Sequence, residues 1–340
     1  MTAPQITILD LSLDGDGHRG PYLAMLCRLF PAQVLRYGPT ALFSRRSVLV
    51  PMIEESLARY ALACLVGALI GRRTVGFLFR PRPALEGRGL RMRTKRSVLA
   101  ALRRLPGVST LTILPFALEP GFARIANDWI YDLQLWDLVQ ADQPEPAGAG
   151  GALADSLRAR AGGRALCVAV GRQDRGKGFD QFVQAWTGSA ELRQTTLFAY
   201  GGMVDPALAA AAKAFSAAGG FGLDRLISDA ELLDFYAAAD LVWCVYAPDY
   251  DQASGILGRA MQLGIPVAVR SGSLIERLCR AEGHPCVALG DPVQTAVLAA
   301  LPPPLDPGAA RARALRHGAE SLRRLAAALG VEQPGPAADA

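Results

Sequence analysis

The stretch Val168-Ala-Val-Gly-Arg-Gln-Asp-Arg-Gly-Lys-Gly-Phe-Asp180 leads from an apolar run through a polar loop into a helical pattern. The run from Ala165 to Val170 is typical of a strand that is buried on both faces of a parallel sheet. Arg172 and Lys177 then stand in the loop at the carboxyl end of this strand, where open α/β sheets bind ligands. Because the amino end of the next helix favours anions, the loop is suited to holding a phosphate. The alternative is an ordinary solvated surface loop.

Lysine is scarce in this chain, which draws attention to Lys177. The sequence has three lysines, Lys95, Lys177 and Lys213, against a large excess of arginine. A lysine ammonium is a compact point charge, whereas the arginine guanidinium is a planar fork. A lysine in so arginine-rich a sequence hints at a point-charge role.

The composition predicts a globular protein of two domains. The chain has 340 residues, of which 51% are hydrophobic and 20% charged, and this balance can bury a sizeable core. Its formal charge of +5 does not by itself indicate nucleic acid, and it suits an anionic substrate or an anionic membrane surface equally well. Six cysteines without a Cys-x-x-Cys pair predict buried thiols in a reducing compartment, and three histidines argue against a zinc site.

The lack of a recognisable targeting signal in this sequence predicts a cytoplasmic location. The amino-terminal segment has no charged stretch followed by an apolar one, so no signal peptide is predicted. The longest apolar run, from Ala61 to Ile70, is too short to span a bilayer. We therefore expect a cytoplasmic protein that is soluble, or at most peripheral at the inner membrane face.

Strands and helices alternate along both halves of the chain, which predicts the α/β class with two doubly wound, Rossmann-like parallel sheets. The proline- and glycine-rich segment Gln140–Gly151 is the best linker. We expect an N-terminal domain at 1–142, a C-terminal domain at 143–308, and at 309–340 a C-terminal helix that crosses back to the N-terminal domain, followed by a frayed tail. Two such domains predict a ligand cleft between them. The predicted strands are Gln5–Leu11, Val34–Tyr37, Thr74–Phe79, Thr110–Leu114, Leu166–Val170, Thr196–Tyr200, Leu241–Val245 and Pro266–Arg270.

A second candidate phosphate contact lies downstream. The strand Leu241–Val245 ends in the acidic loop Tyr246–Asp251, after which Ser254-Gly255 begin a helix. The start of a helix offers free backbone N–H groups and a positive dipole end. Together with the two cations of the first loop, this helix start would cradle a diphosphate from two sides.

At this point the chain resembles the retaining GT-B glycosyltransferases, in particular the large family-four group. That group has Gly-Arg-x4-Lys-Gly, a helix end of Phe/Tyr-x-x-Ala-Asp, then Glu-x7-Glu-Ala-Met and Gly-x-Pro-Val. Four segments of this sequence match in the same order: Gly171-Arg172-x4-Lys177-Gly178, Phe235-Tyr-Ala-Ala-Ala-Asp240, Asp251-x7-Arg259-Ala260-Met261 and Gly264-Ile-Pro-Val267. The match covers about Leu166 to Arg270, whereas the first half matches by architecture and by the loop Gly15-Asp-Gly-His-Arg-Gly20.

The resemblance implies a nucleotide-diphospho-sugar co-substrate, no cofactor and no bound metal. Arg172 and Lys177 would neutralise the diphosphate as leaving group. Asp251 takes the place of the first family glutamate, which contacts the hydroxyls of the donor sugar. The helix start would bind phosphate through the N–H groups of Ser254 and Gly255.

The resemblance also implies a contact from the first half of the chain, where a glycine-rich loop approaches the donor. Gly17 and His18 are the nearest match to that loop. His18 would orient an acceptor or lie near the transferred sugar, and the alternative is a loop histidine in solvent.

One position departs from the family. The second family glutamate binds the nucleotide ribose, and this chain has Arg259 there. Arginine cannot accept hydrogen bonds from ribose hydroxyls. Ribose is then held in another way, or Arg259 meets a phosphate, or donor binding is lost.

Two further segments are candidates for acceptor or membrane contact. A basic stretch runs from Arg80 to Arg104 and is either a solvated face or a contact with anionic lipid or a polyprenyl-diphosphate acceptor. The segment Asn127–Asp137 combines aromatic and acidic side chains, which either stack on a sugar acceptor or pack at the domain edge.

The resemblance therefore implies a metal-independent, hexosyltransferase-type retaining enzyme of cell-envelope or exopolysaccharide assembly, acting on a saccharide or lipid-linked saccharide acceptor and not on nucleic acid. It also implies that the domain at 1–142 lies on the acceptor side and that the domain at 143–308 binds the nucleotide-sugar donor. One alternative is a GT-B sugar-nucleotide epimerase, for which His18 is the plausible histidine. Another is a degenerate transferase that binds sugar nucleotides as a sensor or scaffold. A dinucleotide oxidoreductase is disfavoured because no Gly-x-Gly-x-x-Gly follows a strand with an acid about twenty residues on.

Overall fold

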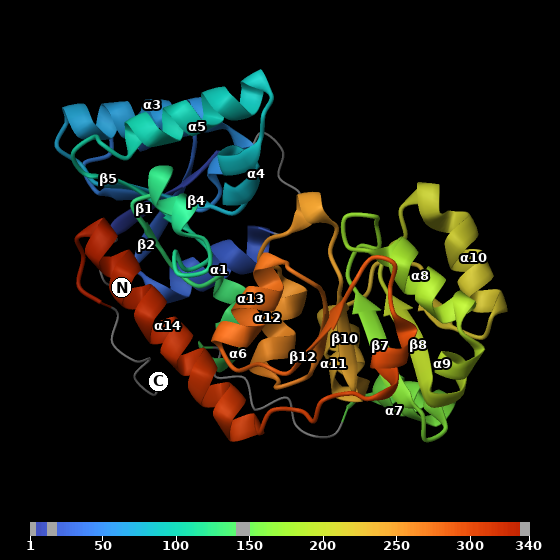
Figure 1. Ribbon diagram of the computed structural model, residues 1–340. Helices are drawn as coiled ribbons and strands as arrows, with labels where there is room; N and C mark the ends of the chain where they lie inside the picture. Colours follow the sequence, from blue (N-terminus) through green and yellow to red (C-terminus); the bar gives the residue numbers. More distant parts are fainter. Residues whose placement is uncertain (1–4, 12–18, 141–149, 334–340) are drawn as a thin grey trace. The chain divides into compact units, whose positions relative to one another are not determined.

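The computed structural model describes residues 5–11, 19–140 and 150–333. The chain divides into two compact units: unit 1 comprises residues 1–133 and 316–340, and unit 2 comprises residues 134–315. Each unit contains a six-stranded sheet with helices against it (Figure 1). The predicted pair of Rossmann-like parallel sheets is confirmed, because the strand pairings of both sheets are parallel.

In unit 1 the sheet has the strand order β2-β1-β3-β4-β5-β6. Its core is formed by apolar residues of the strands and of the two helices α3 and α5, which pack against each other. The strands are β1 Ile6–Asp10, β2 Ala32–Arg36, β3 Ser47–Val50, β4 Thr74–Leu78, β5 Val108–Thr112 and β6 Asp128–Trp129. The helices are α1 Arg19–Leu29, α2 Pro39–Leu42, α3 Leu57–Leu69, α4 Pro81–Glu86 and α5 Leu90–Leu102, with short 3-10 turns at Ile53–Glu55 and Pro120–Arg124.

In unit 2 the sheet has the order β12-β11-β10-β7-β8-β9. The strands are β7 Ala165–Val170, β8 Thr196–Gly201, β9 Phe221–Leu223, β10 Leu241–Cys244, β11 Val267–Arg270 and β12 Cys286–Leu289. The helices are α6 Asp137–Gln140, α7 Ala152–Ala161, α8 Phe179–Gly188, α9 Ala190–Thr195, α10 Ala209–Ala217, α11 Asp229–Ala238, α12 Gly255–Gln262 and α13 Leu274–Ala281. The 3-10 turns are Leu133–Leu135 at the start of the unit, Pro206–Leu208, Pro248–Tyr250 and Thr295–Ala299.

The strand order of unit 2 reverses at β7. This strand pairs with β8 on one side and with β10 on the other. Ligands of open α/β sheets bind at such a switch point, beyond the carboxyl ends of the strands, because the two following loops diverge there. The loop after β7 and the loop after β10 therefore flank the expected binding position in unit 2.

Aromatic packing fixes helix α8, which follows the first of these loops. Phe179 and Phe182 are fully buried, and the Phe182 ring lies 4.7 Å from that of Phe198 and 5.4 Å from that of Trp243, measured between centroids. Phe179 also meets Tyr200 edge to face at 5.0 Å. Because these rings come from α8, β8 and β10, they hold the start of α8 rigidly against the sheet.

Several elements differ from the sequence-based expectation. Strands β3, β6, β9 and β12 were not predicted. Strands β6 and β9 have three residues or fewer and give no clear period, whereas length alone does not explain β3 and β12, because β10 and β11 also have four residues and were predicted. Helix α5 begins at Leu90, although its first turns carry arginines and lack the apolar repeat that marks a buried helix face.

The long helix α14, Pro307–Leu329, begins in unit 2 and ends in unit 1. In unit 2, buried Arg313 donates to the carbonyl oxygen of Met261 at 2.6 Å and to His284 Nδ1 at 3.1 Å. In unit 1, Ser47 Oγ donates to the carbonyl oxygen of Leu329 at 2.7 Å. Each unit thus anchors its own part of the helix. Among the helices of the described residues, none is both long and apolar enough to cross a bilayer.

Candidate functional site

The loops after β7 and β10 are in direct contact. Ala247 N donates to the carbonyl oxygen of Gly176 at 2.9 Å, and Trp243 Nε1 donates to that of Gly178 at 3.2 Å. Gly178 has a left-handed φ of +71°, and a Cβ at this position would lie 1.9 Å from the carbonyl oxygen of Val245. A side chain is excluded there by conformation and by space. Gly178, the second glycine of the Gly-Arg-x4-Lys-Gly motif, is therefore required to bring the two loops together.

Lys177 lies half-buried at this junction. Its backbone N–H donates to Asp174 Oδ1 at 2.9 Å, which shapes the loop. A Cβ built on Gly171 would lie 3.2 Å from Lys177 Nζ and 3.3 Å from Ile256 Cδ1, so the ammonium group lies close to the first turn of α12. The predicted diphosphate cradle requires that the Lys177 ammonium group and the start of α12 lie close together in this way.

The charge of Lys177 is poorly compensated. Its Nζ forms no hydrogen bond or ion pair with any residue that the structure describes. Burial lowers the pKa of the Lys177 ammonium, and the nearby Arg172 lowers it further, while Asp174 and the Cys244 thiol act in the opposite direction. An anionic ligand at this position would supply the missing counter-charge.

Arg172 is exposed and lies between two carboxylates. Its Nε is 3.7 Å from Asp174 Oδ2 and its Nη2 is 3.6 Å from Asp205 Oδ2, with 61% of the side chain exposed. These contacts are long for ion pairs in solvent and hold the guanidinium weakly. Arg172 can therefore turn to a ligand at low cost.

The predicted helix start at Ser254-Gly255 is confirmed. Ser254 is the N-cap of α12, where its Oγ accepts from Leu257 N at 3.2 Å and lies 2.6 Å from the Tyr246 hydroxyl. The side-chain amide of Gln134 covers Gly255, because a Cβ there would lie 1.9 Å from Gln134 Oε1. A ligand that binds the N–H groups of this turn would contact or displace the Gln134 side chain.

Asp251 faces away from solvent. Its side chain is 1% exposed, and Oδ2 lies 3.0 Å from Arg270 Nη2. Both carboxylate oxygens also accept from Leu274 N, at 2.9 and 3.0 Å. Arg270 in turn donates to the carbonyl oxygen of Tyr246 at 3.0 Å. In this structure Asp251 ties the loop after β10 to β11 and α13, and its contact with a donor sugar stays a prediction.

Arg259 points along α12 toward α6. Its Nη2 lies 3.4 Å from Asp137 Oδ2, and its Nε is buried and has no hydrogen-bond partner within the part of the chain that the structure describes. Gln262 Nε2 donates to the other oxygen of Asp137 at 2.7 Å. The carboxylate that the family has on this helix is thus replaced by a cation paired with an acid from α6. The predicted phosphate contact of Arg259 stays a prediction.

Sequence reasoning missed two residues of this site. Arg270 stands at the carboxyl end of β11, and a cation at the end of a predicted parallel strand was a signal that could have identified it. Gln134 carried no such signal, since only the fold places it against α12. The predicted contacts Gly17 and His18 lie outside the described residues.

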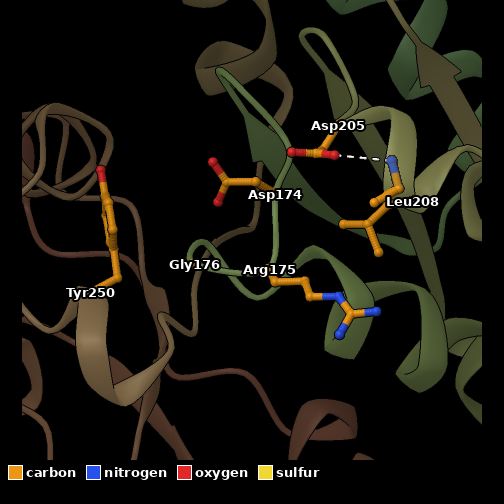
Figure 2. Close-up of a pocket in the computed structure, with 7 residues that line it drawn as sticks. Asp174, Arg175, Gly176, Asp205, Leu208 and Tyr250 are labelled. Carbon is orange, nitrogen blue, oxygen red and sulfur yellow. Dashed lines mark hydrogen bonds between the residues drawn. The ribbon is translucent and has the colours of Figure 1, made fainter.

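A shallow pocket of about 340 Å³ opens beside the loop after β7. In Figure 2 the ring of Tyr250 faces the loop at Gly176, while Asp174 and Asp205 border the opposite side. A Cβ on Gly176 would lie 3.3 Å from Tyr250 Cδ2 and 3.2 Å from Asp174 Oδ1, so a larger residue would narrow the space. The pocket combines the aromatic face of Tyr250 and the apolar residues Ala207 and Leu208 with the charged residues Asp174, Arg175 and Asp205. Within the described residues, no group of three or more His, Cys, Asp or Glu could hold a metal ion.

Comparison with known proteins identifies the fold. No protein-family model matches the sequence, and no curated protein matches it. Among solved structures, HepE of Anabaena in complex with UDP is 14% identical and covers 96% of this chain and 99% of its own, with a TM-score of 0.57. The α,α-trehalose 6-phosphate synthase of Burkholderia multivorans is 13% identical over 97% and 96% of the two chains, also with a TM-score of 0.57. The trehalose-6-phosphate phosphatase N-terminal domain of Candida albicans is 10% identical over 94% and 96%, with a TM-score of 0.59.

These similarities establish the fold of the protein. The chain has the GT-B fold, with two Rossmann-like units, as the sequence resemblance predicted. At 10–14% identity they show the fold alone. What this chain does must be argued from its own residues.

Proposed function

We propose that this protein is a glycosyltransferase that moves a sugar from a nucleotide-diphospho-sugar to an acceptor hydroxyl. One observation carries the proposal: the half-buried ammonium of Lys177, without an ion-pair partner among the described residues, lies beside the first turn of α12 at the switch point of the sheet. A diphosphate is the ligand that such a cation and a helix amino end favour together. The similar structure of HepE was solved with UDP.

Each residue would act by electrostatics and not by covalent chemistry. Lys177 would stabilise the charge that develops on the diphosphate as the sugar leaves, and Arg172 would turn from its two carboxylates to the same group. Because these cations supply positive charge at the phosphate, we propose that the reaction needs no metal ion. The pocket beside Tyr250 has the lining to accept a ring of the donor.

The finer part of the proposal rests on the resemblance to the family-four enzymes. It comprises a retaining outcome, transfer of a hexose, a saccharide or lipid-linked saccharide as acceptor, and a role in envelope or exopolysaccharide assembly in the cytoplasm. His18 and Gly17 would approach the donor from the first half of the chain.

A second candidate function is a sugar-nucleotide sensor or scaffold. Two observations favour it, since Asp251 is buried in an ion pair and Arg259 stands where the family has a ribose-binding carboxylate. Such a protein would keep diphosphate binding through Lys177 without transfer.

The test separates the two candidates. Calorimetry with UDP, GDP, ADP and their glucose or mannose conjugates measures donor binding, and nucleotide release is then followed with and without a panel of saccharide and polyprenyl-phosphate acceptors. A transferase binds a nucleotide sugar and releases nucleotide faster when an acceptor is present. Binding without release under every condition supports the sensor, and the absence of any binding contradicts both.

A further inference from the structure

The outer face of α3 is apolar. The helix turns four buried residues toward the sheet, namely Tyr60, Ala63, Cys64 and Gly67. On the opposite side Leu62 is 44% exposed, Leu65 48% and Leu69 86%, and Ile70 follows at 44%. Spacings of three and four residues align these leucines in one stripe along the helix. A surface helix normally carries charged residues there, so an exposed apolar stripe marks a candidate interaction surface.

Helix α5 lies beside α3 on the same side of the sheet (Figure 1). Right-handed crossovers place them so, because α3 joins β3 to β4 and α5 joins β4 to β5 in the same direction. The exposed residues on and around α5 include an apolar Leu90, 81% exposed, and four arginines, Arg88, Arg91, Arg93 and Arg104. None of these four guanidinium groups forms a hydrogen bond or ion pair with a described residue.

The charge around the two helices is almost entirely positive. From Ser56 to Leu118 the sequence has twelve lysines and arginines and one acid, Glu86. That acid is already paired with Arg82 at 2.9 Å. Glu54 and Glu55 just precede this segment and Glu119 follows it; all three are partly buried, and Glu54 lies 4.0 Å from Lys95. The exposed arginines therefore lack acidic partners within the segment, and they lie on or next to the helix that packs beside α3.

We propose that the α3/α5 face, meaning the outer sides of α3 and α5 in unit 1, docks on an anionic lipid bilayer. The leucines of α3 would insert at the boundary between headgroups and acyl chains, while the arginines of α5 bind lipid phosphates. The leucine stripe favours a bilayer over nucleic acid, which offers no apolar phase. A second copy of the chain is disfavoured, because a two-fold contact through this face brings the same arginines against each other.

The experiment is vesicle co-flotation of the full-length protein without nucleotide sugar. Wild-type protein is expected to float with vesicles containing phosphatidylglycerol and to stay unbound with pure phosphatidylcholine. Binding should weaken when the salt is raised, since screening shortens the reach of the charges. The charge variant R91E/R93E should bind at least twenty-five-fold more weakly, because each cation near an anionic surface strengthens binding about five-fold. The apolar variant L65Q/L69Q should also lose binding.

Matched controls separate this face from net charge and general hydrophobicity. R311E/R316E makes the same charge change at exposed positions of α14, and L226Q removes an exposed leucine of unit 2. Both controls should float like wild type, and circular dichroism should show that all variants are folded. The proposal is overturned if wild type ignores anionic vesicles, or if the controls lose binding as much as the α3/α5 variants do. It is equally overturned if sedimentation shows a dimer that L65Q/L69Q dissociates while lipid binding is nil.

Discussion

Asp251 and Arg270 form a buried ion pair in unit 2, with 3.0 Å between Asp251 Oδ2 and Arg270 Nη2. The pair joins the loop after β10 to the last residue of β11, and Leu274 N at the start of α13 donates to the same carboxylate. A residue that the sequence pattern assigned to the donor sugar thus holds together three elements around the site.

The first prediction concerns this pair. Asp251→Ala leaves Arg270 largely buried without its counter-charge, and we expect a loss of about 3–5 kcal/mol in the free energy of unfolding. Urea denaturation measures it. Asp249→Ala is the matched control, because Asp249 is an exposed acid two residues away. Equal stability of the two variants would show that the buried pair does not hold the loop.

The second prediction concerns the diphosphate. Lys177→Ala should weaken UDP binding about 10- to 100-fold, since a charged hydrogen bond to a half-buried cation is lost. Arg172→Ala should cost up to about five-fold, because its exposed guanidinium is screened by solvent. Calorimetry measures both, and the exposed Lys213→Ala is the control. If Lys177→Ala and Lys213→Ala bind UDP equally well, the site lies elsewhere.

The pH dependence of nucleotide binding gives a third prediction. Burial lowers the pKa of Lys177 in the free protein, whereas a bound diphosphate favours the ammonium and raises that pKa again. Affinity should therefore be constant below the lowered pKa and fall as the pH rises through it. In Lys177→Arg the charge persists at all accessible pH values, so this alkaline loss should disappear. A wild-type affinity that stays flat to pH 10.5 would contradict the role of Lys177.

The fourth prediction concerns His284. Its Nε2 lies 3.0 Å from the carbonyl oxygen of Ile265 and its Nδ1 accepts from Arg313, so the ring is held neutral. Burial, together with the charge of Arg313, lowers the pKa of His284 from 6.5 to about 3.

Below pH 6.5 the unfolded chain binds a proton at His284, whereas the folded chain keeps this ring neutral. The contribution of His284 to the free energy of unfolding is therefore complete above pH 6.5 and is lost as the pH falls toward 3. The slope should approach about 1.4 kcal/mol per pH unit. Urea titrations between pH 4 and 8 should show a flatter profile for His284→Gln than for wild type. Identical profiles would mean that the folded state binds the proton at His284 as readily as the unfolded chain does.

Local patterns were sufficient for much of the fold. The apolar run of β7 and the periodicity of α8 and α12 identified a doubly wound sheet, because burial on both strand faces and on one helix face leaves a mark in the order of residues. The same patterns missed β3 and β12, although the equally short β10 and β11 were predicted. They also missed Gln134, because its contact with Gly255 joins two residues that are 121 positions apart in the sequence.

By itself, the sequence determined that cations follow β7, that a helix begins after Ser254, and that glycine occupies position 178. Tertiary structure decided which charges are satisfied. It pairs Asp251 with Arg270 and Arg259 with Asp137, and it leaves Lys177 Nζ without an ion-pair partner among the described residues. The physical reason is that a strand or a helix arises from the order of neighbouring residues, whereas the partner of a charge depends on which distant segments the packed sheet brings within a few ångströms.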